Sequence, residues 1–258
     1  MQVDPIKAFS DNYIWCLRDE HGGGSAAVVD PGDAQPVLDY LHQHRLRLAA
    51  ILITHKHSDH TGGIRPLLEA YPGIAVYGPR NEPIAALTER VAAGDRVELQ
   101  SLAGFAVLDL PGHTEGHVAY FGEGALFCGD TLFAAGCGRV FSGTHGQLYA
   151  SLQQIATLPA ETLIYCAHEY TLDNLGFAQW VEPDSAALKE RLEREQQRRR
   201  SGLPTVPSTL EEELRTNPFL RSHLPHVKAM VEKYAGKALR DGEAVFTALR
   251  TWKDREYD

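Results

Sequence analysis

Four side chains that commonly bind metals lie within six residues, directly after an apolar run at residues 49–54. The continuous apolar run predicts a strand that is buried on both faces. His55 and His57 are two residues apart, so at the extended end of a strand their rings point to the same side. Asp59 and His60 follow as the chain turns. Because the chain has 12 histidines, ordinary surface histidines are the alternative interpretation. Such close packing of ligand types favours a metal site.

The rest of the first two-thirds of the chain predicts short strands separated by Gly, Pro and Asp turns. Strands are expected at 25–30, 49–54, 74–77, 96–99, 105–110, 118–121, 125–128 and 163–166, and helices at 36–46, 63–71 and 147–158. After His168 no strand-like run follows. Helices are expected at 184–200, 209–215, 227–234 and 242–253, the first of them as a polar helix with a solvated face. The pattern predicts an α/β region followed by an all-α region from about residue 169.

Composition narrows the class of protein. The chain has 258 residues, of which 43% are hydrophobic and 23% charged, which excludes a disordered chain, a coiled coil and a collagen-like fibre. Residues 1–168 carry 10 basic against 18 acidic side chains, which argues against a nucleic-acid partner. No apolar run approaches the roughly 20 residues of a membrane span. No secretory signal is visible, so we expect a cytosolic protein.

The four cysteines form no CxxC pair, so neither a zinc ribbon nor a disulfide framework is expected. Cys16, Cys128 and Cys166 lie in apolar stretches and are interpreted as small buried residues. Cys137 is the only one in loop-like sequence.

Three further predicted strands end in ligand-type residues, namely His113, Asp130 and His168. With the first cluster they make five histidines and two aspartates, more than one tetrahedral metal can use. Such a set fits two metals that share a bridging carboxylate. His117 begins a predicted strand and is interpreted as structural.

These motifs, THKHSDH, PGHTEGH, CGDTLF and AHEY, resemble the metallo-β-lactamase superfamily. Within it, GDTLFAAGCGR, AHEYT and the helical tail resemble glyoxalase II, the hydroxyacylglutathione hydrolases. The resemblance runs from SDNYIW near the start to LRTWKD near the end. It implies a four-layer αββα catalytic domain at residues 1–168 and a smaller helical, glutathione-binding domain at residues 169–258.

The resemblance also implies a ligand set and a reaction. The set is His55, His57 and His113 for one metal, Asp59, His60 and His168 for the other, and Asp130 as the bridge. Two divalent ions per chain are expected, zinc first, with iron or manganese as alternatives. The implied reaction is hydrolysis of S-(2-hydroxyacyl)glutathione, typically S-D-lactoylglutathione, by a hydroxide held between the two metals. It is the second step of methylglyoxal detoxification. Asp59 is the candidate to orient that hydroxide or accept its proton.

Five residues match substrate-contact positions of the family: Arg139, Phe141, Tyr170, Arg250 and Lys253. Arg139 is Lys in some members, and Phe141 stands where some carry a Tyr, so a phenolic contact is lost there. Arg250 and Lys253 are three residues apart on one predicted helix face and suit a carboxylate. From the residues alone, a solubilising surface is the alternative for this pair, and a core-edge tyrosine is the alternative for Tyr170.

Two classes of rival remain. One is another enzyme of the same fold: a lactamase, a nuclease, or a mononuclear-iron dioxygenase acting on a glutathione persulfide. The other is a non-catalytic metal-binding or thiol-binding module, which loss of a ligand would have supported. The expected partner is a small-molecule glutathione thioester, with no nucleic acid and no membrane, and the expected state is a monomer.

Overall fold

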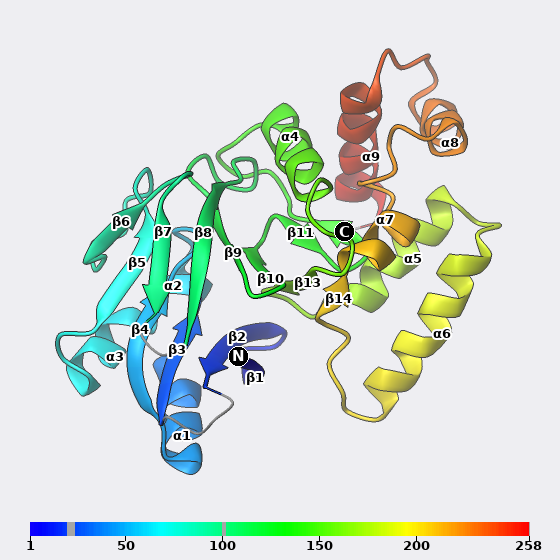
Figure 1. Cartoon of the computed structure of the whole chain (residues 1–258). Coiled ribbons are helices and arrows are strands. Elements are labelled where there is room, and N and C mark those ends of the chain that lie inside the picture. Colours follow the sequence, from blue (N-terminus) through cyan, green and yellow to red (C-terminus); the bar gives the residue numbers. More distant parts are fainter. Residues whose placement is uncertain (20–23, 100–101, 258) are drawn as a thin grey trace.

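The computed structural model describes residues 1–19, 24–99 and 102–257. Its first sheet has six strands in chain order (Figure 1), β1 (Gln2–Ala8), β2 (Asn12–Arg18), β3 (Ser25–Val29), β4 (Arg47–Leu52), β5 (Ala75–Pro79) and β6 (Glu89–Val91). β1 to β3 pair antiparallel, whereas β3 to β6 pair parallel. Parallel strands are usually joined by crossover helices. Helices α1 (Ala34–His44), α2 (Ser58–Thr61) and α3 (Ile64–Ala70) lie in the connections from β3 to β4 and from β4 to β5, whereas β5 and β6 are joined by a short segment without a helix.

The second sheet also has six strands, in the order β14-β13-β10-β9-β8-β7. Their bounds are β7 (Arg96–Leu99), β8 (Ala103–Asp109), β9 (Val118–Gly122), β10 (Ala125–Gly129), β13 (Leu163–Cys166) and β14 (Ser208–Thr209). A small hairpin of β11 (Leu132–Phe133) and β12 (Gly136–Cys137) follows β10. Helix α4 (His145–Ile155) precedes β13 and begins at a capping box of Thr144 and Gln147.

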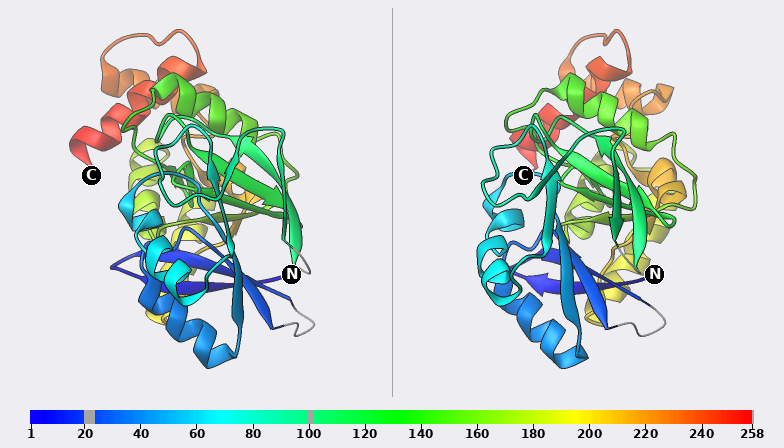
Figure 2. Two further views of the ribbon diagram at one scale, coloured as in Figure 1. Left: turned by 90° about the vertical axis from the view of Figure 1, so that its left-hand side faces the viewer. Right: turned by 60° about the vertical axis from the view of Figure 1, so that its left-hand side comes forward.

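Successive side chains along the strands of the first sheet pack into two separate hydrophobic cores, one on each face of the sheet. In β3, Ala27 and Val29 pack toward the second sheet with Phe105 and Val107 of β8. The intervening Val28 packs instead with the helices α1 and α3. Because a strand alternates its side chains, the two sheets face one another and helices cover their outer faces. Figure 2 shows the two sheets stacked between helices, which is the expected four-layer αββα arrangement.

The remaining helices gather at one end of the molecule, beyond the second sheet (Figure 1). They are α5 (Thr171–Val181), α6 (Ala186–Arg200), α7 (Leu210–Thr216), α8 (Pro225–Ala235) and α9 (Gly242–Glu256). α9 packs on α4 and α8. None of the helices in the described part of the chain is both long and apolar enough to cross a membrane.

Three sequence expectations for this region are wrong. A strand does follow His168, because β14 pairs with β13 and extends the second sheet. α5 was not predicted. The polar helix α6 is not simply a solvated face, since Arg191 is fully buried against Glu213 and Thr216. A buried charge needs such partners.

Candidate functional site

Loops at the ends of four strands bring the seven candidate ligands together. After β4 come His55 and His57 in a loop and Asp59 and His60 in the short helix α2, whereas His113, Asp130 and His168 follow β8, β10 and β13. Close backbone packing supports these loops. Gly129 directly precedes Asp130 with φ 48°, and a Cβ there would lie 2.3 Å from Thr54 Oγ1. Glycine is therefore required at this turn.

The three imidazoles of the first group face one another. His57 Nδ1 lies 3.1 Å from His55 Nε2 and 3.0 Å from His113 Nε2. One proton on His57 Nδ1 can satisfy only one of the two facing nitrogens. The lone pair of the other nitrogen then has no donor within this group. A cation between the three rings would satisfy it.

The second group is built around two carboxylates. His60 Nε2 lies 3.3 Å from Asp59 Oδ2 and 3.5 Å from Asp130 Oδ1. His168 Nε2 lies 3.4 Å from the same Asp130 oxygen, while Asp130 Oδ2 lies 3.4 Å from His113 Nε2 in the first group. The two oxygens of Asp130 therefore face different groups, which is what a bridging carboxylate requires.

The residues present fit divalent metals. His60 Nε2 and Asp130 Oδ1 are buried and have no hydrogen-bond partner in the described structure. Buried polar atoms normally have a partner, so both atoms are left facing the space where a cation would sit. Two sets of three ligand atoms, His55–His57–His113 and Asp59–His60–His168, each lie within 4.8 Å of one another. Imidazole and carboxylate are ligands that zinc, iron and manganese accept.

Partners outside these groups hold the histidine rings in place, and the sequence reasoning missed them. His60 Nδ1 donates to Asp30 Oδ2 at 3.0 Å, and His168 Nδ1 donates to Asp11 Oδ1 at 2.7 Å. Each bond fixes Nδ1 as the donor and turns Nε2 into the cluster as the nitrogen that would bind a metal, as in histidine–carboxylate pairs at metal sites. Asp30 also ends an apolar strand, so the strand-end pattern that located Asp130 could have found it.

His55 and His113 are held in the same way by uncharged partners. His55 Nδ1 lies 3.0 Å from Thr54 Oγ1, which itself donates to Asp30. His113 Nδ1 donates to the Arg139 carbonyl at 2.7 Å. Nε2 of each of these two rings is therefore left with a lone pair that faces into the cluster.

Burial and charge set the protonation of the cluster. Burial lowers the pKa values of His55, His57 and His113, which favours the neutral, ligating form. Burial also lowers the pKa of His60, but the carboxylates of Asp130 and Asp30 outweigh burial and raise this pKa well above its usual value. This histidine therefore holds a positive charge among the carboxylates, a charge that a metal ion would replace.

The candidate substrate residues line one cavity with the ligands. The cavity has a volume of about 410 Å³ and is lined by His57, Asp59, His113, Asp130, Phe133, Cys137, Arg139, Phe141, His168, Tyr170, Asp173, Asn174, Arg250 and Lys253. All five candidate substrate residues are among them. Phe133, Cys137, Asp173 and Asn174 were not predicted to take part. Their signal was weak, because they come from the β11–β12 hairpin and from the unpredicted helix α5.

Arg250 and Lys253 are not surface charges. Their exposed fractions are 1% and 5%. Arg250 Nη1 donates to the Cys137 carbonyl at 3.0 Å, and its Nη2 pairs with Asp254 at 2.8 Å. Lys253 Nζ lies 3.5 Å from Asp173. The solubilising-face alternative is therefore wrong, because both side chains are buried in the wall of the cavity.

The other three candidates surround the mouth of the cavity. Tyr170 is 37% exposed and its ring stacks on His168 at 4.7 Å. Phe141 is 64% exposed and packs edge-on against His57 and His113. Arg139 lies 3.3 Å from Asp254.

Two other residues behave as non-ligands. His117 is buried and stacks on His55, and its Nε2 accepts from the Asp130 amide, as a structural histidine would. Cys137 lines the cavity, but burial raises its pKa to about 11. A thiol that stays protonated at neutral pH is a poor nucleophile.

Known proteins match nearly the whole chain. The hydroxyacylglutathione hydrolase C-terminus family matches residues 169–256, and the metallo-β-lactamase superfamily matches residues 12–168. A hydroxyacylglutathione hydrolase of Halorhodospira halophila is 50% identical over 252 residues, covering 98% of each chain. The crystal structure of ETHE1 from Myxococcus xanthus superposes with a TM-score of 0.67 at 25% identity, covering 97% of this chain and 90% of that one.

A further solved structure, TTHA1623 in a di-iron-bound form, is 26% identical with a TM-score of 0.60, covering 85% of this chain and 100% of that one. It shares the fold of the present chain. Together with the two family matches, the identity to the Halorhodospira halophila protein over nearly the full length decides the assignment. The chain belongs to the hydroxyacylglutathione hydrolase family of the metallo-β-lactamase superfamily.

Proposed function

We propose that this protein hydrolyses S-(2-hydroxyacyl)glutathione thioesters, typically S-D-lactoylglutathione, to the 2-hydroxy acid and glutathione. The observation that carries the proposal is the single cavity that joins the histidine–aspartate cluster to the buried cations Arg250 and Lys253. A metal held by the cluster would polarise the thioester carbonyl, and the two cations would bind a carboxylate of glutathione. The names of the relatives point to the same substrate class.

We assign the metal ligands as the sequence reasoning did. His55, His57 and His113 would hold one ion, Asp59, His60 and His168 the second, and Asp130 would bridge them. Bound divalent ions supply a nucleophile from water at neutral pH and polarise the thioester carbonyl. We propose two ions per chain with zinc as the first candidate and iron or manganese as alternatives. The di-iron-bound relative supports a binuclear site.

The chain's own residues supply binding and orientation. Arg250 and Lys253 would bind the glycine carboxylate, with Arg139 beside them, while Tyr170 and Phe141 would flank the thioester. Asn12 Nδ2 donates to Asp59 Oδ2 at 3.0 Å and fixes that carboxylate at the cavity edge. We assign Asp59 the role of orienting the attacking water or accepting its proton. The departing thiol has an ordinary pKa of about 8.5, so it leaves without a strong general acid.

We propose further that the protein is a cytosolic monomer, with residues 1–168 as the catalytic domain and residues 169–258 as the glutathione-binding domain. Four free, buried cysteines suit a reducing compartment. Light scattering of the purified protein measures its molecular mass and so tests the monomer.

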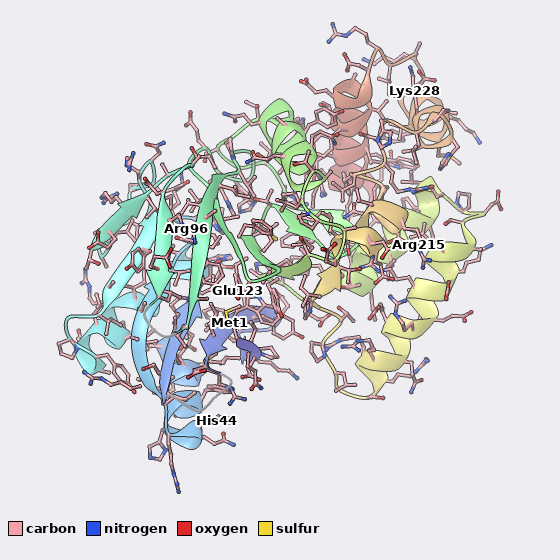
Figure 3. All side chains as sticks on the ribbon, in the orientation of Figure 1. Met1, His44, Arg96, Glu123, Arg215 and Lys228 are labelled. Atoms are coloured by element: carbon pink, nitrogen blue, oxygen red, sulfur yellow. The ribbon has the colours of Figure 1, made fainter. Side chains whose placement is uncertain are left out.

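The proposal is tested by measuring metal content and thioester turnover on one preparation before and after chelation. We expect about two metals per chain, with S-D-lactoylglutathione activity lost on chelation and restored by metal. Replacement of a ligand, His57→Ala, should remove most of the bound metal and most of the thioester turnover. His44→Ala is the matched control, because His44 is exposed at the end of α1, away from the cavity (Figure 3).

Normal metal content and kcat in His57→Ala would refute the ligand assignment. One iron per chain, no thioester cleavage and oxygen uptake with a glutathione persulfide would identify a dioxygenase instead. Thioester turnover that survives complete chelation would identify chemistry independent of metal.

A further inference from the structure

Side chains from three helices hold the backbone of one short turn in the cavity wall. The turn, as defined here, spans residues 133–137, from the last residue of β11 to the end of β12. Four of its carbonyls accept hydrogen bonds from side chains: Phe133 and Gly136 from Asn217 Nδ2 (3.1 and 2.8 Å), Ala134 from Asn174 Nδ2 (3.1 Å) and Cys137 from Arg250 Nη1 (3.0 Å). The amide of the fifth residue, Ala135, donates to Glu213 Oε2 at 2.7 Å. Each of the five residues is held by a side chain that lies at least 40 residues further along the chain.

Glu213 on α7 divides its carboxylate between two tasks. Its Oε1 accepts from Arg191 and from Ser208 within the helical region. Its Oε2 accepts from the Ala135 amide at 2.7 Å and lies 3.0 Å from Asn217 Nδ2, whose two protons are shared among this oxygen and the Phe133 and Gly136 carbonyls. The side chain is fully buried, so these bonds are shielded from water. One oxygen therefore holds the helical region together, and the other holds the turn.

The turn has a backbone conformation that requires such support. Ala135 is fully buried with φ 57°, in the left-handed region that non-glycine residues rarely adopt. Strained residues persist where the surroundings over-determine them, and they cluster at functional sites. The Glu213 carboxylate fixes the Ala135 amide in this conformation.

The turn connects directly to the substrate side of the cavity. The Phe133 ring packs edge-on against Tyr170 at 5.4 Å and against His168 at 5.8 Å. The Cys137 carbonyl accepts from Arg250. A displaced turn would therefore move both the aromatic wall and the anchor of the arginine that we assign to the glycine carboxylate.

We propose that Glu213 and Asn217 are positioning residues for thioester binding, because they set the turn that places Phe133 and anchors Arg250. The inference rests on the proposed function and deepens it. It gives the helical region a second task besides contributing cations. Neither residue lines the cavity, so both act through the turn.

The test compares two thioesters with Asn217→Ala and Glu213→Gln. S-D-lactoylglutathione carries the glycine carboxylate, whereas S-lactoyl-N-acetylcysteamine lacks it. For both variants we expect KM for the glutathione thioester to rise about tenfold, with kcat within about twofold, because a small displacement of the binding groups weakens remote binding. We expect unchanged metal content and a much smaller loss in kcat/KM for the short thioester, which meets the aromatic wall beside Phe133 but has no carboxylate for Arg250. Ser208→Ala is the matched control, since it removes one bond on the Oε1 side only, and it should behave as wild type.

An unchanged KM in folded variants would overturn the inference, as would equal losses on both thioesters, which mark a general structural defect. If the variants do not fold, hydrogen exchange of the wild-type protein decides. The Ala135 amide should exchange far more slowly than that of Glu123 in the exposed turn after β9 (Figure 3), and equal rates would contradict the inference. Wild-type protein that leaves S-D-lactoylglutathione intact would refute the proposed function itself, a result distinct from an altered variant.

Discussion

At the scale of single residues, Asp30 supports the cluster without lining the cavity. It accepts from His60 Nδ1, from Thr54 Oγ1 and from the Thr54 amide, and it is buried. We expect Asp30→Asn to weaken metal binding by about 10- to 100-fold, as loss of a histidine's outer partner does elsewhere. Metal titration against a competing chelator measures this change.

The matched control is Asp39→Asn, which changes an exposed carboxylate on α1. If Asp30→Asn binds metal as tightly as this control, the carboxylate is not orienting His60. The prediction would then be wrong.

Arg250 combines a binding role with a structural one, because it is buried and donates to the Cys137 carbonyl. We expect Arg250→Ala to raise KM for S-D-lactoylglutathione roughly tenfold or more, with a smaller loss in kcat, since a charge-assisted hydrogen bond is worth about 1.5–3 kcal/mol. Steady-state kinetics measure both constants. Arg255→Ala on the exposed side of the same helix should leave KM unchanged. An unaltered KM in folded Arg250→Ala would exclude this residue from substrate binding.

At the scale of elements, α9 depends on its first turn. Asp241 caps the helix by accepting from the Ala244 amide at 2.9 Å. We expect Asp241→Ala to lower the free energy of unfolding by about 1 kcal/mol, and Asp241→Ser to retain most of it, because serine also caps. Urea unfolding measures the difference. KM should stay at its wild-type value, since Arg250 and Lys253 lie more than two turns away. A large rise in KM would show that the cap also controls the site.

The helices also show where sequence patterns fail. α5 buries residues around much of its circumference, among them Thr171, Asn174 and Phe177, because it packs on the β11–β12 hairpin as well as on α6 and α8. A helix covered on several sides has no clear polar face for the pattern to reveal. α6 looked solvated because two of its three buried residues, Arg191 and Glu195, are charged, and Glu213, the partner of Arg191, lies on another helix.

At the scale of the whole molecule, all four cysteines are buried free thiols. Burial raises the pKa values of Cys16 and Cys166 to about 12 and that of Cys137 to about 11, and it raises the pKa of Cys128 as well. The reactive thiolate is therefore scarce at pH 8. We expect no rapid reaction with a disulfide reagent in the native protein and four reactive thiols after unfolding in guanidinium. A fast-reacting native thiol that is lost in Cys137→Ser would show that Cys137, which lines the cavity, is accessible and ionised.

The sequence by itself determined the ligand types and the strands that carry them. These are local features of the chain: the spacing of the ligands within residues 54–60, the strand-end positions of His113, Asp130 and His168, and the alternation of side chains along each strand. Only the tertiary structure decided what surrounds them: which histidine Asp11 and Asp30 each hold, the cavity, and the burial of Arg250. These depend on contacts between residues far apart in the chain, such as Glu213 with Ala135. The sequence neighbours of a residue do not reveal such a partner. A buried charge needs a group that pairs with it, and the packing of distant segments decides which group that is.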